Sequence, residues 1–124
     1  MKAEKYHKSV ADYYDEEAES FESRAHENHV LQTLRNRFRT IVLDGDVGDL
    51  LEIGYGPGLD MVWFASLERV RIVNGLDITP EFHKIVSAKA EKIANMNPLL
   101  GGPGDCLSPL GPNSIDTIYV FFGA

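Results

Sequence analysis

The spacing of apolar side chains predicts two helices in the first third of the chain. Residues 9–25 are polar and acidic, but four apolar side chains recur there at helical spacing and form a thin stripe. Residues 28–42 are predicted to form a second helix, with five apolar side chains on one face and Arg35 and Arg39 on another. The arginine face is interpreted as the solvated face. The apolar stripes consist of Val10, Tyr14, Ala18 and Phe21 in the first helix, and of Val30, Leu31, Leu34, Phe38 and Ile41 in the second.

After a turn rich in glycine and aspartate, the pattern changes to strands that alternate with helices. Short apolar runs predict strands at residues 49–53 and 70–76, and a helix is predicted between them at residues 59–67. Thr79 is a suitable N-cap for the next helix, whose apolar positions extend to Met96. Because strands and helices alternate, we expect parallel pairing with right-handed crossovers.

The last two strands are predicted to differ in regularity. A third strand is expected near residues 98–104, where the content of glycine and proline predicts a short or irregular strand. Residues 114–122 are apolar, β-branched and aromatic, and they predict a regular fourth strand. The predicted fold class is therefore α/β, with a Rossmann-like parallel sheet preceded by two N-terminal helices.

Composition and charge narrow the function classes. The chain has 124 residues, of which 44% are hydrophobic and 25% charged, and this suits one globular domain. Its net charge of −7 repels phosphate backbones, so nucleic acid is not expected as a partner. No membrane partner is expected, because no apolar run approaches the roughly 20 residues that span a bilayer. The single cysteine, Cys106, excludes an internal disulfide and fits a cytoplasmic location, and the charged N-terminus does not resemble a signal peptide.

The most informative segment is residues 52–58 (EIGYGPG), in which the end of the first predicted strand runs into a glycine-rich loop at residues 54–58. Its glycines stand at every second position, and glycine is needed where the backbone takes a positive φ or where a ligand touches the main chain. Asp77 follows Gly58 by 19 residues and stands at the end of the second strand. An acid at about this distance lies beside the loop and can accept hydrogen bonds from the hydroxyls of a ribose. Loop and acid together predict a site for an adenosine-bearing ligand.

The spacing of the glycines distinguishes between adenosine ligands. The dinucleotide fingerprint is G-x-G-x-x-G, whereas this loop has G-x-G-x-G and is preceded by Glu52. A carboxylate repels a pyrophosphate but attracts an ammonium group, and S-adenosylmethionine carries an ammonium, a sulfonium and no phosphate. The segment resembles the first motif of the class I S-adenosylmethionine-dependent methyltransferases, which is an acidic residue followed by x-G-x-G-x-G.

The resemblance covers nearly the whole chain and implies roles for individual residues. Glu52 would hold the methionine ammonium, directly or through water, and Asp77 would bind the ribose. Ile78 would pack on the adenine, and Asp105, in a Gly-Asp pair, would meet the adenine amino group. No catalytic side chain and no metal is implied, because the sulfonium is already a reactive methyl donor and the protein chiefly aligns the reactants. The residues implied in cofactor binding are Glu52, Gly54, Tyr55, Gly56, Gly58, Asp77, Ile78 and Asp105.

The resemblance also implies a division of the chain and a function. Residues 1–44 would form an N-terminal helical lid, and residues 45–124 the Rossmann-like region that binds S-adenosylmethionine. The family has seven strands, so this chain is expected to end after its fourth. The expected function is methyl transfer to a small-molecule acceptor, in a chain that lacks the second half of the fold. Residues 114–122 would then form an apolar edge strand, which predicts a homodimer or a second chain that completes the sheet.

Other interpretations stay open. The glycine loop could be a tight turn that binds no ligand, and Asp105 could merely shape a glycine-rich turn. The chain could also be a non-catalytic module that binds S-adenosylmethionine or dimerises through its fourth strand. A nicotinamide-dependent reductase is disfavoured by the glycine spacing.

Several side chains with chemical potential are expected to be structural. Tyr119 is expected to pack in the core, and Asp116 to be a solvated strand end or a turn partner. His83 is expected to be an exposed residue of its helix. His26 and His29 are expected to lie on a solvated helical face, because no third metal ligand has a suitable spacing.

Overall fold

The computed structural model describes residues 29–106, 110–111 and 114–121. The predicted helix at residues 9–25, most of the predicted lid and His26 lie outside these residues. The described elements are α2 (His29–Leu43), β1 (Asp49–Ile53), α3 (Leu59–Ala65), β2 (Ile72–Asp77), α4 (Pro80–Ala90), β3 (Met96–Leu100), α5 (Pro103–Cys106) and β4 (Thr117–Val120).

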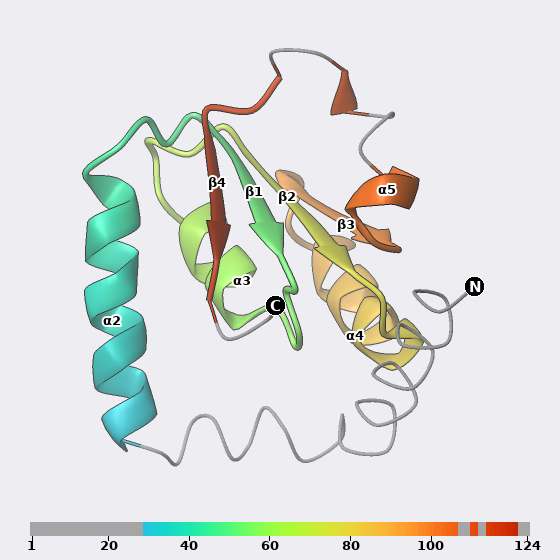
Figure 1. The fold of residues 1–124 in the computed structure, drawn as a ribbon, viewed down its shortest axis with the longest axis horizontal. Coiled ribbons are helices and arrows are strands. Elements are labelled where there is room, and N and C mark those ends of the chain that lie inside the picture. The colour runs from blue at the N-terminus through green and yellow to red at the C-terminus, as the bar shows by residue number, and fades with distance from the viewer. Residues whose placement is uncertain (1–28, 107–109, 112–113, 122–124) are drawn as a thin grey trace.

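The described strands form a parallel sheet in the order β3-β2-β1-β4 (Figure 1). The first three strands are joined through α3 and α4, as the alternating pattern predicted. Figure 1 shows α2 along the β4 side of the sheet and α4 along the β3 side. The predicted α/β class with a Rossmann-like parallel sheet is confirmed.

The core lies mainly on the face of the sheet that the helices cover. Leu50 and Val73 are aligned on neighbouring strands and are fully buried there, together with Met61 and Phe64 of α3. A smaller cluster on the opposite face contains Leu51 and Leu76, with partly buried apolar neighbours. Ile118 is aligned with Leu51 but is 59% exposed. The described residues therefore cover one face of the sheet well and leave the opposite face open at β4.

The predicted orientation of the second helix was wrong. Arg35 and Arg39 of α2 are buried, whereas Val30 is 71% exposed and Ile41 is 64% exposed. The physical reason is a carboxylate: Asp60 of α3 is buried and forms ion pairs with both arginines. A buried charge needs a partner more strongly than a single apolar side chain needs burial, so α2 turns its arginine face toward α3.

The third strand was also predicted wrongly. Instead of an irregular segment at residues 98–104, β3 pairs with β2 over five residues, and it begins at Met96, which had been assigned to the preceding helix. Pro98 is tolerated because β3 lies at the edge of the described sheet, where one side of the strand needs no ladder hydrogen bonds. The glycines follow the strand, and Gly101 has a φ of 136°. The fourth strand is shorter than predicted, since residues 114–116 only lead into it.

Candidate functional site

The loop between β1 and α3 is held in a shape that favours glycine. Gly54, Gly56 and Gly58 have φ values of 74°, 55° and 83°, all in the left-handed region. The N–H of Gly54 donates to the carbonyl of Leu76 at 2.7 Å, which ties the loop to the end of β2. The N–H of Gly58 donates to the carbonyl of Tyr55 at 3.0 Å and closes the turn before α3 begins.

Two of these glycines have different local surroundings. A Cβ on Gly58 would lie 2.8 Å from Cγ2 of Val86, so this glycine allows α4 to pack closely against the loop. A Cβ on Gly56 would meet nothing within 4 Å. Gly56 is therefore the position where a ligand could approach the main chain, while Gly58 serves packing. Lys89 of α4 also supports the loop, because its Nζ donates to the carbonyl of Pro57 at 2.7 Å.

Asp77 lies beside the glycine loop at the end of β2, as expected from the sequence. The N–H of Gly56 donates to its Oδ2 and the N–H of Thr79 to its Oδ1, each at 2.9 Å. Burial raises the pKa of the Asp77 carboxyl, and these backbone hydrogen bonds oppose the rise. Each carboxylate oxygen has a second lone pair, so a carboxylate fixed in this way can still accept hydrogen bonds from two hydroxyl groups.

Glu52 lies on β1 and is buried beneath the helices. The hydroxyl of Tyr119, on the neighbouring strand β4, donates to its Oε1 at 3.1 Å. Burial raises the pKa of Glu52 well above its ordinary value, and the negative charge of Asp60 raises it further. The expected core position of Tyr119 is confirmed, and its hydrogen bond to Glu52 is an addition that the sequence did not predict. A positive charge placed near Glu52 would therefore stabilise the ionised form of its carboxyl group.

A buried triad of charges joins α2 to the start of α3, close to the loop. Arg35 Nη1 donates to Asp60 Oδ2 at 2.5 Å, and Arg39 Nε donates to Asp60 Oδ1 at 2.8 Å. Arg35 also lies over the ring of Phe121, which follows β4. Sequence reasoning missed this triad. The available signal was the pair of arginines one turn apart on α2 together with an acid just after Gly58.

The other predicted residues are placed as follows. The Tyr55 ring is buried, and its hydroxyl contacts Nδ1 of His83 at 3.0 Å and donates to the carbonyl of Leu99 at 3.3 Å. His83 is therefore half-buried and not exposed as predicted, because it shares a hydrogen bond with this tyrosine. Ile78 is half-buried beside Asp77, and Asp105 lies in α5.

Asp116 and His29 take the structural positions that were expected. Asp116 is an exposed residue just before β4, and its Oδ2 accepts the N–H of Asp49, the first residue of the neighbouring strand β1, at 2.8 Å. His29 is exposed at the start of α2. Among the described residues, no three His, Cys, Asp or Glu side chains gather into a group that could hold a metal ion. Within the same part of the chain, none of the helices is both long and apolar enough to cross a bilayer.

The fold resembles those of methyltransferases of known structure. Phosphoethanolamine N-methyltransferase 1 of Haemonchus contortus, in complex with phosphoethanolamine and S-adenosylhomocysteine, aligns with 94% of this chain at a TM-score of 0.67 and 18% identity. The DhpI–SAM–HEP complex aligns with 91% at a TM-score of 0.64 and 18% identity. A SAM-dependent methyltransferase from Aquifex aeolicus aligns with 66% at a TM-score of 0.54 and 20% identity.

This chain spans only 24%, 49% and 45% of the lengths of those three chains, respectively. No protein-family model matches the sequence, and no curated protein matches it. At these identities the comparison shows a shared fold.

Proposed function

We propose that this chain binds S-adenosylmethionine at the carboxyl ends of β1 and β2 and serves a methyltransferase that acts on a small molecule. The observation that carries the proposal is the carboxylate of Asp77, which accepts hydrogen bonds from the N–H of Gly56 and of Thr79. These hydrogen bonds link the acid that would bind the ribose directly to the glycine loop. Proteins of the same fold hold S-adenosylhomocysteine or SAM in their solved structures, which supports the choice of ligand.

The residues present fit the cofactor at both of its ends. Gly56 presents main chain with open space where a Cβ would be, so the ligand could lie against the loop. Asp77 would accept the ribose hydroxyls, and Ile78 and Asp105 would meet the adenine. Glu52 would attract the ammonium group, directly or through water, because burial makes its negative charge costly without a positive neighbour.

S-adenosylmethionine supplies a methyl group that is already activated by the sulfonium. The task of this chain would be to bind and orient the cofactor and to exclude water from it. A small-molecule acceptor is supported by the Haemonchus contortus structure, whose enzyme was crystallised with phosphoethanolamine. The net charge of −7 argues against a nucleic-acid acceptor, and the single cysteine is consistent with a cytoplasmic location.

A second candidate function is a cofactor-binding module that pairs through β4. This strand lies at the edge of the described sheet, and its side chains Ile118 and Val120 are exposed. Apolar edge strands invite pairing, either with a second copy or with another chain that extends the sheet. Light scattering after size-exclusion chromatography tests the homodimer, and a monomer at micromolar concentration would contradict it.

The cofactor proposal is tested by following the melting temperature of the protein while S-adenosylhomocysteine is titrated. At a ligand concentration of about 100 times Kd, binding should stabilise the fold by about 2.7 kcal/mol. For a domain of this size, that raises Tm by roughly 10 °C. Asp77→Asn should abolish the shift, because an amide cannot accept both backbone and ribose hydrogen bonds on two charged oxygens.

Asp116→Asn is the matched control. It makes the same chemical change to a carboxyl group that also accepts a backbone hydrogen bond, but at the opposite end of the sheet. The control should keep the full response to S-adenosylhomocysteine. An unchanged Tm of the unsubstituted protein at millimolar ligand would overturn the cofactor proposal and favour the pairing module.

A further inference from the structure

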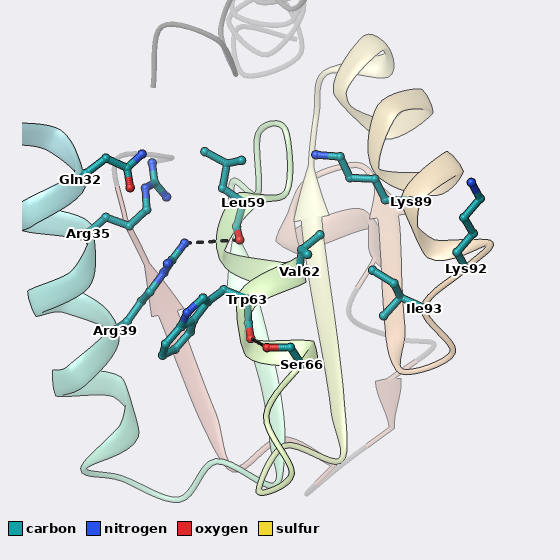
Figure 2. Close-up of a pocket in the computed structure, with 10 residues that line it drawn as sticks. All are labelled: Gln32, Arg35, Arg39, Leu59, Val62, Trp63, Ser66, Lys89, Lys92 and Ile93. Carbon is teal, nitrogen blue, oxygen red and sulfur yellow. Dashed lines mark hydrogen bonds between the residues drawn. The ribbon is translucent and has the colours of Figure 1, made fainter. Parts of the chain in front are cut away.

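A groove lies over the outer surface of α3, between α2 and the end of α4 (Figure 2). Its floor is formed by Leu59, Val62 and Trp63, which point away from the sheet, whereas Met61 and Phe64 of the same helix are buried in the core. The volume is about 630 Å³, within the range of sites that hold small molecules. The groove is separate from the glycine loop and Asp77, neither of which lines it.

Both walls of the groove carry positive charge. Arg35 and Arg39 project from α2, and Lys89 and Lys92 project from the opposite side, as Figure 2 shows. Among the described lining residues there is no aspartate or glutamate. Asp60 pairs with both arginines at once, so this triad keeps one net positive charge. Since the whole chain has a net charge of −7, four cations around one groove are a marked local reversal of sign.

Arg35 provides a second and independent sign of a ligand. Its side chain is only 9% exposed, and its Nε is buried without a hydrogen-bond partner in the described structure. Buried polar groups in folded proteins nearly always have a partner. Arg35 itself lines the groove, so an anionic group against its guanidinium would add a charge-assisted contact to a cation that has an unmet hydrogen bond.

The apolar part of the groove further restricts the chemical class of ligand that would fit. The guanidinium of Arg39 lies 4.8 Å from the centre of the Trp63 ring, and Val62 and Ile93 extend the apolar surface toward Lys92. We propose that this groove is a binding site for an amphiphilic anion, with a carboxylate or phosphate head against the cations and an apolar body over Trp63. Charge complementarity and the apolar floor are both required, so neither an inorganic anion nor a neutral apolar molecule fills the site as well.

Trp63 offers a direct test, because it is the only tryptophan in the chain. Decanoate, below its micellar concentration, is titrated into the full chain while Trp63 emission is recorded. Decyltrimethylammonium has the same apolar body with the opposite charge and is the ligand control. The proposal expects a saturable shift of the emission to shorter wavelength with decanoate and a response at least about tenfold weaker with the cation.

Charge reversal at the rim tests the role of the cations without touching the core. Lys92→Glu should weaken decanoate binding by roughly threefold or more, since Lys92 is exposed and lines the groove. Lys84→Glu makes the same change on an exposed residue of α4 that does not line the groove, and it should leave the affinity unchanged.

Two outcomes would overturn the proposal. One is a Trp63 emission that does not respond to decanoate, and the other is an equal response to the two amphiphiles. If decanoate gives no response, a peptide of residues 9–23, which hold six acidic and no basic residues, is added next. A response to this peptide would assign the groove to the acidic segment of the chain itself. None of these readouts depends on S-adenosylmethionine binding.

Discussion

Replacing Asp60 with asparagine tests whether buried charge holds α2 in place. The two guanidinium groups beside Asp60 belong to side chains that are only 9% and 10% exposed, and Asp60 itself is 2% exposed. Asparagine keeps the size of the side chain but removes the charge that both arginines share. Two buried cations would then face each other without a counter-ion, and breaking such a pair costs about 3–5 kcal/mol.

Glu52 should offset a small part of that cost. The charge of Asp60 raises the pKa of Glu52, so its removal lets Glu52 ionise more easily, and Arg35 stabilises that ionised form. We therefore expect Asp60→Asn to lower the free energy of unfolding by about 3 kcal/mol, near the lower limit of the range for buried pairs. Equilibrium unfolding in urea, followed by circular dichroism, measures this difference directly.

An exposed ion pair in the same protein is the control. Arg71 pairs with Asp49, but its side chain is 73% exposed and the pair is screened by solvent, so Arg71→Gln should cost far less stability than Asp60→Asn. The reasoning fails if Asp60→Asn unfolds within 1 kcal/mol of the unsubstituted protein, or if both variants lose the same stability. Either result would mean that packing alone, and not the charge triad, positions α2.

Two further predictions concern the loop and the buried acid. Gly58→Ala should lower the free energy of unfolding in urea by about 2–4 kcal/mol, because the added Cβ overlaps Val86 and the residue also keeps a positive φ. Gly56→Ala should lower it by only about 1–2 kcal/mol, because only the positive φ is unfavourable there. Equal losses of stability would contradict the packing role of Gly58. The pKa of Glu52 is raised in the folded state, so above about pH 4.5 this group keeps its proton longer in the folded chain than in the unfolded chain, and its contribution to stability falls as pH rises. Asp77 contributes a fall of the same sign, because its pKa is raised as well. Glu52→Gln should therefore make the fall of stability with pH less steep, and an identical pH profile of stability in both proteins would refute the assignment.

The parts of the fold that local pattern determines were predictable from the sequence. The strand, glycine loop and helix at residues 49–65 follow from apolar spacing and from glycines that permit positive φ, and the structure has them with small shifts of their ends. The position of Asp77 beside the loop was predictable as well, because the carboxyl ends of adjacent parallel strands meet at one edge.

The wrong predictions concern residues whose burial or pairing depends on partners distant in the sequence. The arginine face of α2 looked solvated because Asp60, 25 residues after Arg35, gives no local sign that it will be buried. The hydrogen bond between Glu52 and Tyr119 spans 67 residues and depends on the pairing of β1 with β4. Pro98 lowered the expected regularity of β3, because nothing in the local pattern indicated that the strand would stand at an edge.

The distribution of these buried charges bears on which ligand the site favours. Two acids, Glu52 and Asp60, lie close enough for one to raise the pKa of the other, but two arginines are committed to Asp60 while Glu52 has a phenol as its hydrogen-bond donor. Bringing a pyrophosphate to the adjacent loop would add negative charge beside a carboxyl group that already resists ionisation. An ammonium group would do the opposite, since it would lower the pKa of Glu52 and gain a charge-assisted contact. The same arrangement that makes ionisation of Glu52 costly without a ligand therefore favours the ammonium group of an amino-acid tail over a dinucleotide.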